Sequence, residues 1–236
     1  SLRARFVVAA DGTQSFVRQA LDIGTLQHDY RQQLFVCSLQ AEKPSNGMAY
    51  ERFSDQGPVA LLPMADGQYG SICGVATEHA ASIASLSDTA YGEYIQQRFG
   101  WRVGKIQKAG ARSHYPLKRV VAEKISALRC VLMGNAAQTI HPIGAQGFNL
   151  GLRDAMSLAQ LVRQVGLIDD LSTRYAQSRE EDRERTLAFS DGLARLTSNQ
   201  SFPLHAMRSL VLSALGQAPK LTGAMVSSTM GMRHHQ

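Results

Sequence analysis

Cysteine is scarce in this chain. Only Cys37, Cys73 and Cys130 are present among 236 residues, and no two of them stand in a C-x-x-C spacing. This scarcity disfavours a zinc site or a disulfide framework, and it predicts free thiols in a reducing cytoplasm.

Long apolar runs and an acidic excess are also absent. No run approaches the ~20 apolar residues that a membrane-spanning helix needs, and no signal peptide is apparent. The net charge of +6, from 25 basic and 19 acidic residues, predicts mild attraction to anions such as phosphates or acidic lipids. No basic run is interleaved with aromatic residues, so we expect no nucleic-acid partner.

Two enzyme motifs are missing from the printed sequence. The absence of G-x-S-x-G disfavours a serine hydrolase. The absence of G-x-G-x-x-G means that the usual binding loop for the ADP half of a dinucleotide is not found in this sequence. Because the chain opens at Ser1 and reaches the apolar run "FVVAADG" almost at once, we expect it to be part of a longer polypeptide.

The chain does contain strand and helix patterns of two kinds. "RFVVAADGTQSFVRQAL" predicts a strand buried on both faces, an Asp11-Gly12 turn and a short helix ended by Gly24. Between Tyr30 and Thr77 four strand-like runs predict an antiparallel meander with one solvated or ligand-facing side, and "ADGQ" predicts a hairpin turn. "SDTAYGEYIQQRFG" predicts a helix with Ser87 or Asp88 as its cap and Gly100 as its end.

The second half of the chain reads as a strand followed by two helices. Cys130–Met133 is the strand, and the second helix is expected over about Leu171–Leu196, with its charged run "SREEDRER" facing solvent. From Gly192 to Gln236 there is no acidic residue, so this segment is expected to contact either a membrane surface or protein. The first helix is predicted to be amphipathic from the spacing of Leu152, Ala155, Met156, Ala159 and Val162.

The stretch "GNAAQTIHPIGAQGFNLGLRDA", Gly134 to Ala155, joins that strand to the first helix. Glycine lets a backbone approach a ligand closely, and a helix start offers unpaired N–H groups and a positive dipole end. Asn135 directly follows the strand, where its amide could bond a ligand hydroxyl. These features predict either a cofactor cradle or an ordinary tight turn.

The same residues carry a family resemblance. Gly134-Asn135-Ala136-Ala137, followed by Pro142, Gln146-Gly147, Asn149, Gly151 and Asp154, resembles the second flavin-binding motif of class A flavoprotein aromatic hydroxylases. "VVAADGTQSFVR", with Asp11, Gly12, Ser15 and Arg18, resembles their D-G motif.

Three positions depart from the usual motif. Asn135 replaces an aspartate, Gln138 a common histidine, and Ala145 a glycine. With these departures the stretch is similar to the hydroxylases of ubiquinone biosynthesis, most of all to the 2-octaprenyl-6-methoxyphenol hydroxylases among them.

The resemblance implies an α/β fold, α+β within this chain. Residues 1–28 and 112–165 would form part of a three-layer FAD-binding lobe, residues 29–111 an antiparallel-sheet substrate domain, and residues 166–236 a C-terminal helical region. No metal is implied, and no catalytic residue is assigned. The implied FAD contacts are Asp11, Gly12, Gly134, Asn135, Pro142, Gly144, Ala145, Gln146, Gly147, Phe148 and Asn149.

The implied activity is a FAD-dependent monooxygenase that hydroxylates a polyprenylated phenol in ubiquinone biosynthesis, with NAD(P)H and O2 as co-substrates. We expect a cytoplasmic protein, peripheral to the inner membrane or part of a ubiquinone-biosynthesis complex. Without G-x-G-x-x-G, the chain alone is expected to be inactive and flavin-free. Two alternatives stay open: a hydroxylase of a soluble aromatic compound, and a non-catalytic binding or assembly module on a decayed flavin fold.

Three single residues also have two interpretations each. His141 is either a catalytic base or, as we expect, a hydrogen-bonded loop residue. Arg18 either binds phosphate or is a solvated or salt-bridged helix residue. Tyr115 either touches substrate or, as we expect, packs in the core.

Overall fold

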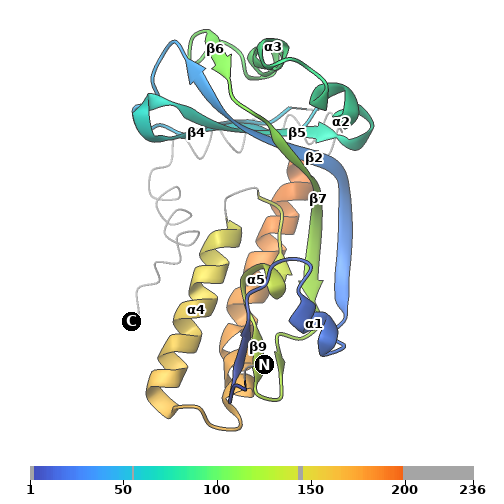
Figure 1. The fold of residues 1–236 in the computed structure, drawn as a ribbon, viewed down its shortest axis with the longest axis vertical. Coiled ribbons are helices and arrows are strands. Elements are labelled where there is room, and N and C mark those ends of the chain that lie inside the picture. The colour runs from blue at the N-terminus through green and yellow to red at the C-terminus, as the bar shows by residue number, and fades with distance from the viewer. Residues whose placement is uncertain (1–2, 55, 143–145, 199–236) are drawn as a thin grey trace. The chain divides into compact units, whose positions relative to one another are not determined.

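The computed structural model describes residues 3–54, 56–142 and 146–198, with only the backbone described from residue 193 onward. Helices and strands mix along the chain (Figure 1), so the expected α/β class is confirmed. The described residues form two compact units, each with its own core. Unit 1 holds the residues up to His28 together with Lys118–Leu196, and unit 2 is mainly Asp29–Leu117.

Each unit has its own set of elements. Unit 1 contains β1 (Val7–Ala9), α1 (Phe16–Ala20), β8 (Ser126–Ala127), β9 (Cys130–Leu132), η2 (Gly134–Ala136), β10 (Gln138–Thr139), α4 (Gln146–Val165) and α5 (Leu171–Ser198). Unit 2 contains β3 (Tyr50–Arg52), β4 (Val59–Pro63), η1 (Ala65–Gly67), β5 (Tyr69–Ala76), α2 (Thr77–Ala84), α3 (Asp88–Phe99) and β6 (Ile106–Ala109). The strands β2 (Thr25–Ala41) and β7 (Ser113–Ala122) contribute residues to both units.

Unit 1 is built on a three-stranded sheet of order β1-β9-β8. β1 runs parallel to β9, with Val8 opposite Val131, as continuous apolar strands favour. Val7 and Val8 are nevertheless 40% and 43% exposed. The expectation of a strand buried on both faces is therefore wrong for the described residues, because β1 lies at the edge of this sheet.

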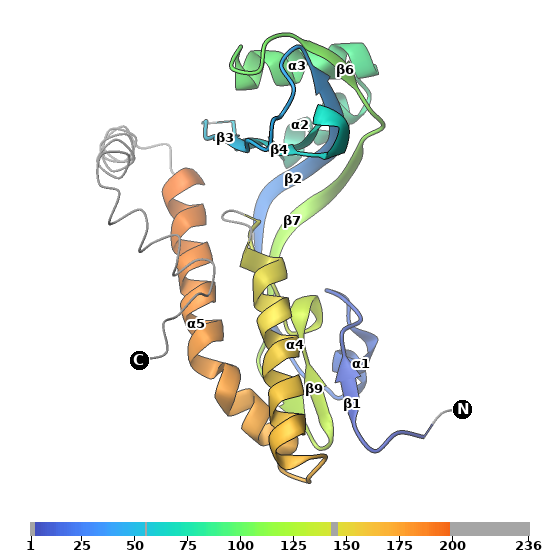
Figure 2. The same cartoon turned by 90° about the vertical axis from the view of Figure 1, so that its left-hand side faces the viewer.

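Helices α4 and α5 lie side by side in both views (Figures 1 and 2). Leu158 on α4 and Leu171 and Tyr175 on α5 pack into the core that includes Val131 and Leu132 of β9. α4 is amphipathic as expected, but its apolar stripe does not face this core. The stripe residues Leu152, Met156 and Val162 are exposed, whereas the buried positions are Gln146, Leu150, Asp154 and Leu158.

The sheet of unit 2 is antiparallel, with β2, β5, β4 and β3 in that spatial order. The predicted meander holds for β3, β4 and β5, but β2 pairs with β5 and not with its neighbour in sequence. The β4–β5 hairpin forms at Ala65–Gly67, where Asp66 and Gly67 take φ angles of 58° and 71°. The short helix α2 was not expected.

Helix α3 begins and ends where the sequence predicts. The Ser87 hydroxyl accepts a hydrogen bond from the Ala90 N–H, which caps the helix start. Gly100 ends it at a φ of 87°, in the left-handed region. Tyr91 and Ile95 of α3 pack with Phe35 of β2 in the core of unit 2.

Candidate functional site

The two sequence motifs leave the sheet of unit 1 at the same edge. Ala9 lies opposite Leu132 in the parallel β1–β9 pair, and the Met133 N–H donates to the Ala9 carbonyl at 3.0 Å. Asp11 and Gly134 therefore follow neighbouring strands at their carboxyl ends. In open α/β sheets this edge is where ligands bind.

The Asp11-Gly12 turn is shaped by its own side chains. Asp11 Oδ2 accepts a hydrogen bond from the Val17 N–H at 3.1 Å, and a further bond from Ser15 helps to hold the pKa of Asp11 below its usual value. The carboxylate is thus directed at the start of α1. Gly12 has a φ of +85°, and no heavy atom lies within 4 Å of where a Cβ would stand, so its backbone is open to close approach.

Arg18 ties this turn to the second motif. Its side chain is buried, and Nη1 donates to the Ala136 carbonyl while Nη2 donates to the Thr13 carbonyl, both at 2.8 Å. Thr13 and Thr139 are also joined, hydroxyl to hydroxyl, at 2.8 Å. The expectation of a solvated Arg18 is wrong, because the side chain is buried and two of its N–H groups donate to backbone carbonyls. Phosphate binding by Arg18 stays a prediction.

The turn of the second motif presents backbone and amide to solvent. Gly134 has a φ of +55°, and no heavy atom lies within 4 Å of where a Cβ would stand. The following Asn135 is exposed, and its side-chain amide makes no hydrogen bond within the described part of the chain. A Cβ on Gly151 would stand 3.3 Å from the Gly134 Cα. Helix α4 therefore lies against this turn.

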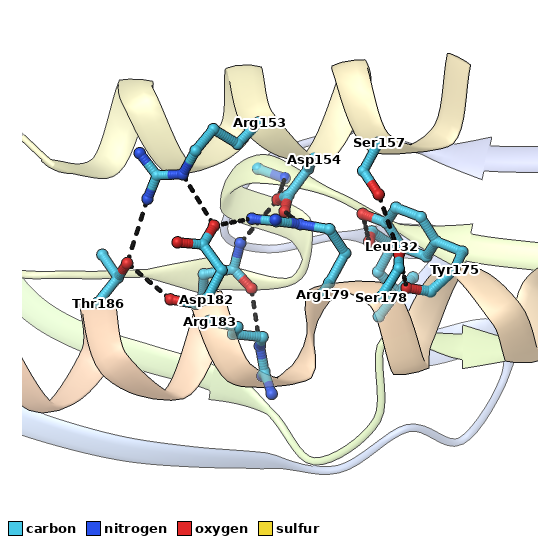
Figure 3. A network of polar contacts seen from close by, with 12 residues as sticks. Leu132, Arg153, Asp154, Ser157, Tyr175, Ser178, Arg179, Asp182, Arg183 and Thr186 are labelled. Carbon is cyan, nitrogen blue, oxygen red and sulfur yellow. Dashed lines mark hydrogen bonds and ion pairs between the residues drawn. The ribbon is translucent and has the colours of Figure 1, made fainter. Parts of the chain in front are cut away.

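The buried carboxylate of Asp154 holds the Gly134 turn in place through a hydrogen bond. Asp154 on α4 is 2% exposed. Its Oδ2 accepts from the Gly134 N–H at 3.1 Å and from Gln138 Nε2 at 2.9 Å, and its Oδ1 accepts from Arg179 Nε at 2.8 Å (Figure 3). Gln138, the departure from a common histidine, is itself 3% exposed.

Helix α5 completes this network from its inner face. Arg179 Nη2 and Arg153 Nε both donate to Asp182 Oδ2, at 2.5 and 2.8 Å (Figure 3). Burial opposes the charge of Arg179, but its hydrogen bonds to Asp154 and Asp182 outweigh this and raise its pKa. Burial likewise opposes the charge of Asp182, and the two arginines outweigh it, so the pKa of Asp182 is lowered.

Arg183 reaches the strand side of the network. Its Nε donates to Gln138 Oε1 at 2.9 Å and its Nη2 to the Ala122 carbonyl at 2.6 Å. Burial lowers the pKa of Arg183. The prediction that "SREEDRER" faces solvent is thus wrong for Arg179, Asp182 and Arg183. The four-residue spacing of Tyr175, Arg179 and Arg183 would have placed them on one helix face.

The first turns of α4 lie against Ile140 and the Gly134 turn. Gln146 is buried, and Phe148 is 79% exposed. A Cβ placed on Gly147 would stand 3.7 Å from Ile140 Cγ1. The first helical turn contains no acidic residue, so no acid there offsets the positive end of the helix dipole. Asn149 is partly buried and Pro142 exposed. The expected contacts Gly144 and Ala145 lie outside the described residues.

His141 and Tyr115 are the other two residues with two interpretations each from the sequence. His141 is 2% exposed, and burial lowers its pKa to about 4. Its carbonyl accepts from the Ser190 hydroxyl at 3.3 Å, in keeping with a hydrogen-bonded loop residue. Tyr115 is 50% exposed, so the expectation that it packs in the core is wrong.

The residues at this edge suit a flavin nucleotide. Two glycines with positive φ leave room for a ligand at the backbone, and the Asn135 amide both donates and accepts, as a ribityl hydroxyl requires. The α4 start adds N–H donors without a competing acid. In the described parts of the chain no cluster of metal-ligating side chains is found. No described helix is long and apolar enough to cross a membrane.

The acid-free segment from Gly192 lies almost entirely outside the described residues. The expectation that it contacts a membrane or a protein partner falls on those residues and stays a prediction.

Two relatives of this chain are hydroxylases of ubiquinone biosynthesis. Ubiquinone hydroxylase UbiL of Rhodospirillum rubrum is 31% identical over 98% of this chain and 55% of its own length. The 3-demethoxyubiquinol 3-hydroxylase of Escherichia coli is 28% identical over 98% of this chain and 60% of its own. These relatives confirm the resemblance to the hydroxylases of ubiquinone biosynthesis.

Among solved structures, the fold is similar to that of OxyS anhydrotetracycline hydroxylase from Streptomyces rimosus. The TM-score is 0.69 at 19% identity, over 97% of this chain and 46% of that one. The chain spans about half the length of the curated relatives it matches. Because residues 1–187 match the FAD binding domain and the described geometry suits that nucleotide, this chain belongs to the FAD-binding domain family.

Proposed function

We propose that the protein is a FAD-dependent monooxygenase that hydroxylates a polyprenylated phenol in ubiquinone biosynthesis, using NAD(P)H and O2. One observation carries the proposal: the parallel β1–β9 pair places the D-G turn and the Gly134-Asn135 turn at one sheet edge. The relatives named as ubiquinone hydroxylases support the substrate class. The finer likeness to 2-octaprenyl-6-methoxyphenol hydroxylases stays a prediction.

The residues of the two turns would divide the work of holding FAD. The Asn135 amide would bond the ribityl or pyrophosphate region, and the start of α4 would meet the flavin pyrimidine with its N–H groups. Asp11 would act through the turn that it shapes. The remaining proposed contacts are Gly12, Gly134, Pro142, Gly144, Ala145, Gln146, Gly147, Phe148 and Asn149.

When bound, FAD supplies the redox chemistry that joins NAD(P)H, O2 and the phenol. The part of this chain is to hold, orient and shield. The positive end of α4, which has no acid in its first turn, would stabilise negative charge on a bound flavin. The polyprenylated phenol is proposed to meet the apolar side of the Tyr30–Thr77 sheet.

The test compares the 236-residue chain with the protein expressed from its complete reading frame. Each is purified, titrated with FAD and assayed for NAD(P)H oxidation with a polyprenylated phenol and, separately, with a soluble phenolic acid. We expect flavin binding and prenyl-phenol hydroxylation from the complete protein, and neither from the 236-residue chain. Preference for the soluble acid would contradict the proposed polyprenylated substrate and favour a soluble aromatic compound. A complete protein that does not bind FAD would overturn the proposal of an enzyme.

A further inference from the structure

We propose that Gln138 and Arg183 are positioning residues for the Gly134 turn. Arg183 fixes the direction of the Gln138 amide, the amide holds Asp154, and Asp154 holds the Gly134 N–H. The flavin readout of this proposal rests on the proposed function, whereas the behaviour of the turn itself does not.

The direction of the amide follows from the chemistry of its two neighbours. Arg183 Nε only donates, and it meets Gln138 Oε1 at 2.9 Å. The carboxylate of Asp154, which is paired with Arg179, accepts from Gln138 Nε2 at 2.9 Å. Rotating the amide by half a turn would set oxygen against carboxylate and NH2 against guanidinium. The pair of neighbours therefore selects one orientation.

The amide is buried, so water does not replace a lost bond easily. Gln138 and Asp154 are 3% and 2% exposed, and an unsatisfied polar group in such a place is costly. Arg183 is held in turn by its 2.6 Å bond to the carbonyl of Ala122, at the end of β7. A chain of three bonds thus runs from β7 and α5 into the carboxylate of α4.

The same carboxylate oxygen reaches the turn. Asp154 Oδ2 accepts from both Gln138 Nε2 and the Gly134 N–H. If the bond to Gln138 is lost and Oδ2 shifts, its bond to the Gly134 N–H changes as well. Gly134 stands in the left-handed region, at a φ of +55°. Removing the Gln138 bond frees Oδ2 to move and loosens the backbone that precedes the exposed Asn135 amide.

The experiment uses four variants and one control. Gln138→Met removes both amide bonds at similar size. Gln138→Glu still accepts from Arg183 but presents an acceptor to Asp154. Arg183→Leu removes the orienting donor, and a double Gln138→Met, Arg183→Leu variant tests coupling. Arg185→Leu is the control, because Arg185 lies two residues further along α5 in an exposed pair with Glu181.

The first readout is amide hydrogen exchange of residues 133–140 in the 236-residue chain without flavin. We expect exchange there to accelerate about tenfold in each single variant, which corresponds to ~1.4 kcal/mol, and not in the control. The double variant should resemble the single ones, because coupled residues are non-additive. Unchanged exchange, or effects that simply add, overturns the proposal.

The second readout is FAD affinity of the complete protein, measured by flavin fluorescence, with visible circular dichroism of the bound flavin. We expect the dissociation constant to rise about tenfold and the dichroism to change in Gln138→Met, Gln138→Glu and Arg183→Leu. A rise for Gln138→Met alone would contradict the directional role. If the unsubstituted protein binds no FAD while the exchange result holds, the proposed function fails and the positioning of the turn stands.

Discussion

Asp154 offers the sharpest test of how the turn is held. Its carboxylate accepts three hydrogen bonds, from the Gly134 N–H, Gln138 Nε2 and Arg179 Nε. Asp154→Asn keeps the shape of the side chain, but its NH2 group must face at least one of these donors. The substitution also removes the negative charge beside the buried Arg179.

The expected cost follows from the burial of this pair. The side chains of Arg179 and Asp154 are only 6% and 2% exposed, and breaking a buried pair costs about 3–5 kcal/mol. Because Asp182 still contacts Arg179 at 2.5 Å, we expect the lower end, about 3 kcal/mol.

Urea denaturation of the 236-residue chain, followed by far-ultraviolet circular dichroism, measures this loss. The urea concentration at the midpoint of unfolding should fall, with little change in the slope of the unfolding free energy against urea concentration. Asp169→Asn is the control, because Asp169 is 86% exposed in its pair with Arg129, and we expect it to change stability by less than about 0.5 kcal/mol. A loss below about 1 kcal/mol for Asp154→Asn would refute the reasoning, since a buried pair should cost more.

Three further measurements test other parts of the structure. Because the pKa of buried His141 is about 4 against an ordinary 6.5, the unfolded chain binds the proton first. The free energy of unfolding should therefore fall by roughly 3 kcal/mol from pH 7 to pH 4. His141→Gln should remove this contribution to the pH dependence, as measured by urea denaturation at each pH. Gly151→Ala should destabilise by about 1–2 kcal/mol because its Cβ would stand 3.3 Å from the Gly134 Cα, whereas Gly147→Ala, with 3.7 Å to its neighbour, should be neutral or stabilising in thermal melts. Burial raises the pKa of the Cys73 thiol to about 11, so it should react with a thiol reagent only after urea unfolds the chain; rapid labelling of the native protein would contradict its burial.

The sequence by itself determined the features that depend on neighbouring residues. Ser87 and Gly100 mark the ends of α3 because capping and left-handed backbone are local properties. The β4–β5 hairpin follows from its turn residues in the same way. The resemblance of the glycine-rich stretch after β9 and of the D-G stretch to known flavoprotein motifs indicated the family, whereas the glycine spacing by itself left an ordinary tight turn open.

The tertiary structure decided which charged residues turn inward. From the alternating signs of "SREEDRER" alone, Arg179 and Arg183 look solvated, yet their partners Asp154 and Gln138 come from segments 25 and 45 residues away. Likewise Arg18 meets the carbonyl of Ala136 across 118 residues. A guanidinium is buried only where distant acceptors converge on it, and that convergence is a property of the folded chain and not of any local pattern.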